Sequence, residues 1–412
     1  MFNTVEQAIE WITAQRNPSR GIEAFRSLMT RLGNIQDKIP SIHVAGTNGK
    51  GSTCTFLKDC LNEAGYTVGT FTSPHMVKHQ DRIRINGKWI DDDSFLRICN
   101  EYYSVFIENE LNMFEIDFII ACEFFITQSV DFMVIEVGLG GRLDCTNCLH
   151  HPLISCITSI GLDHMELLGD TKEKIAFEKA GIIKTDSICV VGQVSDSVFN
   201  VILKQANEMH SKIIRCKEVI KIDEASFLFN KKRYEIQSKA NYQMQNATVA
   251  LTILNELSRM NKIKITNDQL FNGIKRSNWE GRFEIVKKHP ILLLDGAHNE
   301  EGIDALLSSI KNLPKPWIFV FSALKDKPAL KMVEKIYNVA DELIVTEFDF
   351  YRVEHAINLK QYDDILCIEN AKEAINRGIR DAEESGTCIV CGSLYFISEI
   401  RDYCLEKGRN DE

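Results

Sequence analysis

The sequence predicts an α/β protein with two domains, each built around a mostly parallel β-sheet. Short apolar runs alternate with helical patterns along most of the 412 residues, as is typical of parallel strands covered on both faces. After residue 214 the pattern changes to an alternation of apolar and polar residues, and the first pattern returns near residue 290. A chain of this length has room for two domains.

The first domain is predicted to contain four buried strands: SIHVAG (41–46), FMVIEVG (132–138), LISCITSIG (153–161) and SICVVG (187–192). The first strand leads through a glycine-rich loop into a helix predicted from Ser52 to Ala64, which Gly65 closes. Residues 214–240 alternate apolar and polar side chains, so we expect a small antiparallel sheet there.

The second series predicts five strands: ILLLDG (291–296), WIFVFS (317–322), ELIVTE (342–347), ILCIEN (365–370) and CIVCGS (388–393). Helical patterns separate them, for example over 300–312 and 327–340. We place the boundary near Glu280–Glu284, although no linker rich in Gly, Pro or Ser marks it. The prediction is a domain of residues 1–282 followed by a smaller, Rossmann-like α/β domain of residues 283–412.

The composition excludes several classes of protein. A net charge of -10 argues against broad nucleic-acid binding, and no apolar run approaches the length of a membrane helix. The N-terminus has the pattern of an amphipathic helix and not of an export signal, so the thirteen scattered cysteines predict reduced thiols in a cytoplasmic protein. The spacings Cys145–Cys148 and Cys388–Cys391 could belong to a zinc site, but we interpret them as buried thiols.

The strongest local signal is a glycine-rich loop between the first strand and its helix. It consists of Gly46, Thr47, Asn48, Gly49, Lys50, Gly51 and Ser52. Backbone N–H groups in such a loop turn toward an anion, Lys50 can reach the β- and γ-phosphates, and the Ser52 hydroxyl can ligate Mg²⁺. The strict GxxxxGK[ST] pattern is not met, because Val44 replaces its first glycine and Gly51 follows the lysine. A glycine-rich turn with a chance lysine is the alternative.

Glu136 ends a predicted buried strand within VIEVGLGGRLDCTN (134–147). A carboxylate at the C-terminal end of a parallel strand points into the ligand crevice, where it can hold Mg²⁺ beside phosphates. A salt-bridged or helix-capping glutamate is the alternative. The first domain is therefore predicted to be a P-loop-type ATP-binding domain.

These two motifs together resemble the Mur-type ligases, and particularly the folylpolyglutamate synthases and dihydrofolate synthases. The second motif departs from the family pattern at Cys145, and its Asp144 is implied to contact substrate. The resemblance implies that His164, in TSIGLDHMELLG (158–169), joins Glu136 around a second Mg²⁺, although Mg²⁺ prefers oxygen ligands. It also implies that Lys179, in EKAGIIK (178–184), is a catalytic lysine carbamylated by CO₂ that becomes an anionic metal ligand.

Further motifs follow later strands, at the edge of a parallel sheet where ligands bind. They are WEGRFE (279–284), DGAHN (295–299), ALKDKP (323–328) and VCGSLYF (390–396), and YQMQNA (242–247) matches the adenine-side segment. By resemblance Asn246, Arg282 and Asp295 contact ATP, with Gln243 close by. His298 is implied to face the reacting phosphate, and Ser393 and Tyr395 to line the amino-acid side.

Residues 72–75 resemble the family segment near the pterin, which places Ser73, Pro74 and His75 at the substrate. Phe114-Glu115 matches a family pair, but Phe118 stands where a threonine is expected. The matching motifs extend from residue 43 to residue 396.

The resemblance implies an ATP-dependent ligase that adds L-glutamate to the carboxylate of folate (tetrahydrofolate polyglutamylation), of dihydropteroate, or of both, through an acyl phosphate. ATP and one or two Mg²⁺ are the implied cofactors. Small molecules are the expected partners, without nucleic acid or membrane, and a monomer is expected. We expect closure of a cleft on ATP, with Gly281 and its neighbours as the hinge. The alternatives are a Mur-type amino-acid ligase acting on a cell-wall precursor, and a nucleotide-binding switch.

Overall fold

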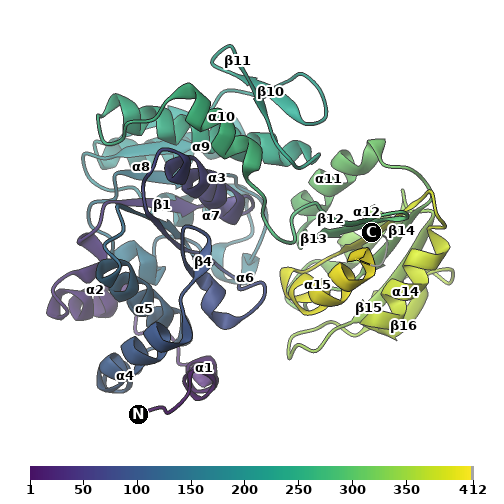
Figure 1. Ribbon diagram of the computed structural model, residues 1–412, viewed down its shortest axis with the longest axis horizontal. Coiled ribbons are helices and arrows are strands. Elements are labelled where there is room, and N and C mark those ends of the chain that lie inside the picture. Colours follow the sequence, from purple (N-terminus) through teal and green to yellow (C-terminus); the bar gives the residue numbers. More distant parts are fainter. Residues whose placement is uncertain (410–412) are drawn as a thin grey trace. The chain divides into compact units, whose positions relative to one another are not determined.

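The computed structural model describes residues 1–409, which divide into two compact units (Figure 1). Unit 1 comprises Met1–Gly161, Leu168–Ile236 and Met244–Ser277. Unit 2 comprises Leu162–Leu167, Gln237–Gln243 and the chain from Asn278 onward. The units thus interleave along the sequence, and the predicted boundary between residues 282 and 283 stays a prediction.

Unit 1 is built on one eight-stranded sheet in the order β4-β3-β2-β5-β1-β6-β7-β8. Strands β2, β5, β1, β6, β7 and β8 are parallel, and the short strands β3 and β4 extend the sheet in antiparallel fashion beyond β2. Their bounds are β1 Ser41–Ala45, β2 Val68–Phe71, β3 Ile83–Ile85, β4 Lys88–Trp89, β5 Phe132–Glu136, β6 Ile154–Ile157, β7 Ile188–Val191 and β8 Lys212–Arg215. Val44 pairs with Glu136, so β1 and β5 end at the same edge.

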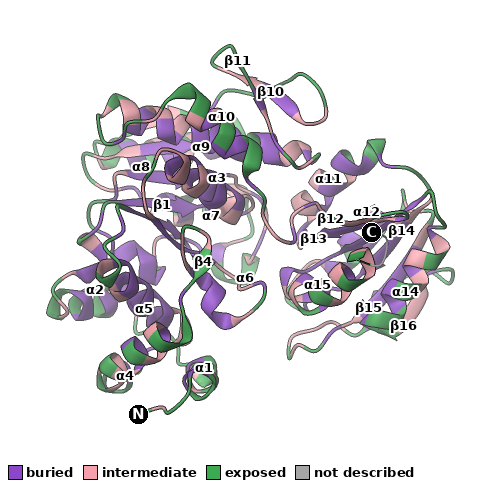
Figure 2. Cartoon of the chain, in the orientation of Figure 1, coloured by how far each residue is buried: buried purple, intermediate pink, exposed green. Residues whose placement is uncertain are grey.

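Alternate residues of β5 enter two different hydrophobic cores, because successive side chains of a strand point to opposite faces. Met133 and Ile135 belong to one core, and Phe132 and Val134 to the other. Both faces are therefore covered, which explains the near-continuous apolar strands and their burial (Figure 2). The prediction of a mostly parallel sheet is confirmed.

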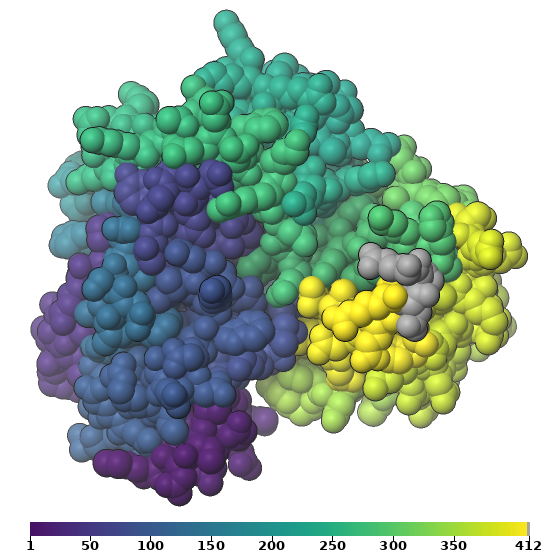
Figure 3. All heavy atoms as spheres, viewed as in Figure 1, coloured from purple at the N-terminus to yellow at the C-terminus, as the bar shows by residue number. Residues whose placement is uncertain are grey.

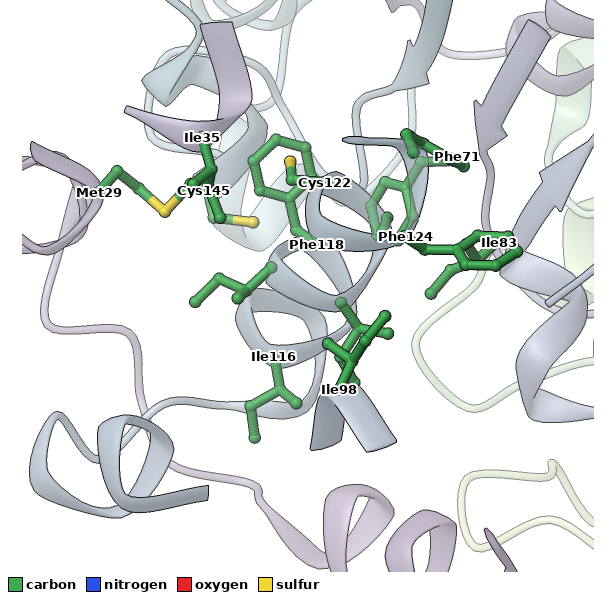
Figure 4. Close-up of a cluster of buried hydrophobic side chains, with 14 of the residues drawn as sticks. Met29, Ile35, Phe71, Ile83, Ile98, Ile116, Phe118, Cys122, Phe124 and Cys145 are labelled. Carbon is green, nitrogen blue, oxygen red and sulfur yellow. The ribbon is translucent and has the colours of Figure 1, made fainter. Parts of the chain in front are cut away.

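The first core surrounds α5, Met113–Thr127, whose side chains are buried on almost all sides. Asn112 begins this helix with a capping box, in which Glu115 returns a bond to the cap backbone. Figure 4 shows Phe118 of this helix among the packed side chains. The other helices of this core are α1 Val5–Ala14, α2 Ile22–Arg31 and α4 Asp92–Glu108, with the 3₁₀ turns Ile35–Asp37, His79–Arg82 and Cys145–Cys148.

The second core lies under α3, Lys50–Glu63, which packs against α10, Asn267–Arg276. The atoms of these two helices meet on the face seen in Figure 3. The helix α3 begins two residues before the predicted start, because Gly49 forms its N-cap. The remaining helices before residue 278 are α6 Met165–Leu168, α7 Lys172–Ala180, α8 Asp196–Glu208 and α9 Asn241–Arg259.

A small antiparallel sheet follows in the order β11-β10-β9, with β9 Ile220–Lys221, β10 Ser226–Phe229 and β11 Lys232–Glu235. The predicted small sheet is therefore confirmed, but its start is wrong. Residues 214 and 215 belong to β8, because their amides continue the parallel ladder beside β7.

Unit 2 contains a six-stranded sheet in the order β12-β13-β17-β14-β15-β16. Only β12 is antiparallel, and the sequence patterns described above do not predict this strand. The strands are β12 Glu284–Lys288, β13 Ile291–Asp295, β14 Trp317–Phe321, β15 Glu342–Glu347, β16 Leu366–Asn370 and β17 Thr387–Cys391. The helices are α11 Glu300–Ser309, α12 Ala329–Tyr337, α13 Ala356–Leu359, α14 Ala371–Asp381 and α15 Leu394–Arg409, with a 3₁₀ turn at Ile310–Asn312.

Two expectations from composition can be compared with the structure. No helix within residues 1–409 is both long and apolar enough to cross a membrane. Every cysteine except Cys367 is buried, which confirms that both Cys-x-x-Cys pairs are buried thiols. Burial raises the pKa of Cys148 and of Cys388 above that of an exposed thiol, so these side chains pack as small apolar groups.

Candidate active site

The glycine-rich loop lies between β1 and α3, at the C-terminal edge of the parallel sheet. The residues that follow β6 hold it from the side. Ser159 accepts a bond from the Thr47 amide at 2.8 Å through its carbonyl and from the Asn48 amide at 3.0 Å through its hydroxyl. Thr158 Oγ1 donates to the Asn48 carbonyl at 2.6 Å. The loop conformation is therefore fixed by protein contacts.

Two glycines of this loop adopt left-handed backbone conformations that leave no room for a side chain. Gly46 has φ +149°, and a Cβ there would lie 1.9 Å from Thr158 Oγ1. Gly49 has φ +84°, and its Cβ would lie 2.2 Å from Asn246 Oδ1. The sequence therefore needs glycine at both positions, and Asn246 of α9 lies directly against the loop, as expected of a residue on the nucleotide side.

Lys50 curls over the loop that precedes it. Its Nζ donates to the Gly46 carbonyl at 3.1 Å and to the Thr47 carbonyl at 3.3 Å, and lies 4.0 Å from Glu136 Oε1. The other oxygen of Glu136 accepts a bond from the Ser73 amide at 3.2 Å. The structure thus brings together the predicted phosphate-binding lysine, the predicted metal ligand and the predicted substrate segment. Ser52 is buried in the first turn of α3.

On the predicted acceptor side, the buried Asp144 organises the glycine-rich turn after β5. Its carboxylate accepts bonds from the Leu139 amide at 2.8 Å and from the amide and hydroxyl of Thr146. Burial raises the pKa of Asp144 although these bonds favour its charged form. The ring of Phe114 packs on Gly138, where a Cβ would lie 2.5 Å from that ring and 3.2 Å from Asp144 Oδ2.

A cavity of about 280 Å³ opens in unit 1 between α2, the end of α4 and the start of α5. Its wall combines an apolar part with polar groups at its rim, as is common for small-molecule sites. The lining residues are Arg20, Gly21, Ala24, Phe25, Ser27, Leu28, Arg31, Asn109, Leu111 and Glu115. Glu115 is the second residue of the predicted Phe-Glu pair, so the sequence pointed to one wall of this cavity and missed the α2 side.

Lys179 is buried in the last turn of α7. Gly141 of the turn after β5 approaches it so closely that a Cβ there would lie 3.0 Å from the Lys179 Cα. The backbone at Lys179 therefore packs against the glycine-rich turn after β5, within unit 1. Its predicted carbamylation stays a prediction.

In unit 2, Asp163 is the centre of a charge cluster. It binds Lys327 Nζ at 2.5 Å and His298 Nε2 at 3.3 Å, and Lys327 Nζ also lies 3.2 Å from His164 Nε2. Burial would raise the pKa of Asp163, but the bond from His298 and the nearby positive charges hold it well below its usual value. Burial lowers the pKa of His164 to about 4, which leaves a neutral imidazole of the kind that metals bind.

Asp295 is a second buried carboxylate of unit 2, at the end of β13. It accepts bonds from the Tyr242 hydroxyl at 2.6 Å, the Phe283 amide at 2.9 Å and the Ala297 amide at 2.8 Å. Burial raises its pKa, whereas Arg282 acts in the opposite direction. Arg282 and Asp295, both predicted to contact ATP, are therefore neighbours.

Ser393 and Tyr395 lie at the start of α15, after β17. Ser393 is buried, and its hydroxyl accepts the Tyr395 amide at 3.2 Å. The Tyr395 ring stacks on Phe350 with centroids 4.5 Å apart. This places both predicted amino-acid-side residues beside the loop that follows β15.

The predicted residues therefore form two groups, one in each unit. Unit 1 holds the glycine-rich loop, Glu136, Lys179, Asn246 and the segment from Ser73 to His75, and unit 2 holds His164, Arg282, Asp295, His298, Ser393 and Tyr395. The joint metal site of Glu136 and His164 stays a prediction, since its two members belong to different units. Within residues 1–409, no three His, Cys, Asp or Glu side chains cluster as metal ligands.

Comparison with known proteins identifies both halves of the chain. Residues 44–261 match the Mur ligase middle domain, and residues 281–394 match the Mur ligase, glutamate ligase domain. The chain is 36% identical to the dihydrofolate synthase/folylpolyglutamate synthase of Bacillus subtilis, over 97% of this chain and 99% of that protein. The chain belongs to the dihydrofolate synthase/folylpolyglutamate synthase family of Mur ligases.

Other members of this synthase family agree with the assignment. The folylpolyglutamate synthase of Lacticaseibacillus casei is 28% identical, with 92% of this chain and 93% of that protein covered. The structure of Escherichia coli FolC in complex with DHPP and ADP is 26% identical, with a TM-score of 0.88 and 98% of both chains covered. The family and fold class that the motifs predicted are thus confirmed.

Several residues that contact the two predicted groups were not found from the sequence. Thr158 and Ser159 support the phosphate loop, Lys327 pairs with Asp163, and Tyr242 binds Asp295. A signal was present for Lys327, since ALKDKP follows a predicted strand, but nothing in the motif distinguished it from Lys325. Thr158, Ser159 and Tyr242 lie at the start of two quoted motifs but carry no charge, so only their contacts reveal what they do.

Proposed function

We propose that this protein is an ATP-dependent ligase that adds L-glutamate to the carboxylate of dihydropteroate, of tetrahydrofolate, or of both. The observation that carries the proposal is the grouping of Lys50, Glu136 and the Ser73 amide at the end of a parallel sheet, in a chain that spans both domains of its family. The family members include proteins named for both acceptor steps.

The residues present fit ATP with Mg²⁺. Gly46 and Gly49 leave a cradle that any Cβ would fill, and Lys50 places an ammonium group over it. The carboxylate of Glu136 and the hydroxyl of Ser52 are oxygen donors of the type that Mg²⁺ prefers. A bound Mg²⁺ would neutralise phosphate charge and orient the phosphoryl group.

The chemistry follows from the weakness of a carboxylate as an electrophile. A carboxylate oxygen of the acceptor attacks the γ-phosphorus of ATP, the bond to the bridging oxygen breaks, and ADP leaves. Lys50 would stabilise negative charge on the transferred phosphoryl group. The amine of glutamate then attacks the acyl carbon, loses a proton and expels phosphate. The acyl phosphate hydrolyses readily, so water has to be excluded while it exists.

Unit 2 is proposed to serve the second half of this reaction. Arg282 and Asp295 would contact the nucleotide, and Ser393 and Tyr395 the amino acid. His298 donates through Nδ1 to the Gly296 carbonyl at 3.0 Å, which fixes its ring, so we assign it to the reacting phosphate. Gly281 has φ +67° within the segment that starts β12, which supports its proposed role as a hinge.

The finer expectations belong to the same proposal. They are a carbamylated Lys179 among the metal ligands, a second Mg²⁺ at His164, and domains of residues 1–282 and 283–412. A cytoplasmic monomer that binds only small molecules is also proposed. The net charge of -10 and the reduced, buried cysteines support this setting.

The test is ADP release in the presence of ATP, Mg²⁺ and L-glutamate, with dihydropteroate or tetrahydrofolate as acceptor. Release with dihydropteroate identifies a dihydrofolate synthase, and release with both acceptors identifies a bifunctional enzyme. Release with tetrahydrofolate alone identifies a dedicated folylpolyglutamate synthase. A folded protein that binds ATP but forms no ADP with either acceptor would refute the proposal and favour a cell-wall precursor as acceptor.

A further inference from the structure

A buried charge cluster lies behind the segment that contains Ser73, Pro74 and His75. Asp117 of α5 is fully buried, and its Oδ1 accepts a bond from His79 Nε2 at 2.7 Å. Its other oxygen has no hydrogen-bond partner among the described residues, but lies at ion-pair distance, 3.7 Å, from Arg82 Nε. A buried carboxylate needs such partners, because an unpaired charge in the interior is strongly unfavourable. No residue of this cluster except His75 has a role in the reaction proposed above.

Arg82 connects this cluster to His75. Its Nη2 lies 3.3 Å from His75 Nδ1. A guanidinium has only donors, so Nδ1 must accept this bond and cannot carry a proton. The proton of the neutral ring is therefore on Nε2. Burial, together with Arg82 and His79, lowers the pKa of His75 to about 3, which agrees with a neutral ring at pH 7.

The loop that carries His75 is fixed at both ends. At its base, the Thr72 amide donates to the Arg82 carbonyl at 2.9 Å. At its turn, Asp81 Oδ2 accepts the amides of Met76 and Val77 at 2.8 and 2.6 Å. Since the Ser73 amide binds Glu136, the loop that carries His75 is also attached to the proposed metal ligand.

We propose that Asp117 is a positioning residue for the acceptor: through Arg82 it holds His75 with its proton on Nε2, so that this N–H donates a hydrogen bond to a carbonyl or carboxylate oxygen of the acceptor. The inference rests on the proposed function and adds to it a donor of defined tautomer. A neutral donor suits this place, because it binds an oxygen without adding a positive charge beside Lys50 and a divalent cation.

The first measurement is the tautomer itself, by NMR of protein labelled with ¹⁵N-histidine, with the His75 signals assigned by their loss in His75→Gln. Protonated Nε2 and unprotonated Nδ1 at pH 7 are expected. In Asp117→Asn, Arg82 loses its counter-ion, and we expect a mixture of tautomers for His75. Protonated Nδ1 in the unmodified protein would overturn the proposal, whether or not the protein proves to be a ligase.

The second measurement is steady-state kinetics. Loss of one hydrogen bond to the acceptor predicts an increase of about 3- to 10-fold in the KM for the acceptor in Asp117→Asn, with the KM for ATP unchanged. Arg82→Lys retains a cation for Asp117 but loses the planar donor at His75, so it should have the same effect. Asp92→Asn, at the exposed partner of Gln80 on the same loop, is the matched control and should leave every KM unchanged.

A pair of substitutions at His75 decides which ring nitrogen matters. The amide nitrogen of glutamine reaches the position of Nε2, whereas that of asparagine reaches only the position of Nδ1. His75→Gln should therefore retain a lower KM for the acceptor than His75→Asn. Equal KM values for these two variants, or an unchanged KM in both Asp117→Asn and Arg82→Lys, would overturn the proposal. Absence of ligase activity in the unmodified protein would instead refute the proposed function.

Discussion

Gly49→Ala tests whether the glycine-rich loop and Asn246 form one nucleotide site. The substitution forces an alanine to φ +84° and places its Cβ 2.2 Å from Asn246 Oδ1, so the loop or the asparagine has to move. Displacement that removes one amide–phosphate hydrogen bond costs about 1.5–3 kcal/mol. This corresponds to a loss of about 10- to 150-fold in affinity for ADP.

Gly65→Ala is the matched control, because Gly65 has φ +91° just beyond the other end of α3 but no atom within 4 Å of the position that a Cβ would take. Both variants carry a left-handed alanine, which costs roughly 1–2 kcal/mol of stability. Thermal unfolding should therefore show a loss for both variants, larger for Gly49→Ala because of the added clash, while calorimetric titration with ADP should show weak binding only for Gly49→Ala. Normal ADP binding by a folded Gly49→Ala protein would refute the placement of the nucleotide.

Three further predictions concern the remaining charged groups. His298→Ala should lower kcat by about 100-fold or more while the Kd for ADP stays nearly constant, and equal losses of both would contradict its role at the reacting phosphate. The depressed pKa of Asp163 stabilises the fold above its unfolded pKa of about 3.9, so Asp163→Asn should cost about 3–5 kcal/mol at pH 7 in denaturant unfolding. That difference should shrink as the pH falls below about 4, and a difference that does not depend on pH would exclude this ion pair as its cause. Lys179→Arg keeps the charge but cannot be carbamylated, so it should lose turnover, and ¹³C NMR in labelled bicarbonate should show a carbamate signal only in the unmodified protein.

Much of the fold could be predicted, because a buried strand is visible in the sequence as a short run of apolar residues. Each predicted strand is present, since a strand covered on both faces must be apolar at nearly every position. Strands β2, β3 and β4 were not predicted, and β2 was missed although all four of its residues are buried, because VGTF is short and contains glycine and threonine. The edge strand β12 reads EIVKK and is only half covered, so it lacks that signal. The first residues of the 214–240 stretch pair with β7, and no local pattern distinguishes that partner from β9 or β10.

The residues of the candidate site also divide into those that could be predicted from the sequence and those that could not. Gly46, Gly49 and Lys50 could be found from the sequence, because a strand, a turn and a helix that are adjacent in the chain assemble the loop, and Glu136 could be found because it ends a buried strand. Asp117 gave no signal, since a single acidic residue within the apolar run of α5 could equally have faced solvent.

The sequence by itself determined the fold class, the family and the phosphate-binding loop, all of which depend on residues close together in the chain. Tertiary structure decided which side chains pair with the buried charges. Lys327 pairs with Asp163, which lies 164 positions away in the sequence. Asp117 pairs with Arg82 and His79, which lie 35 and 38 positions before it. The physical reason is that a buried charge requires a partner in space but sets no distance along the chain at which that partner must lie.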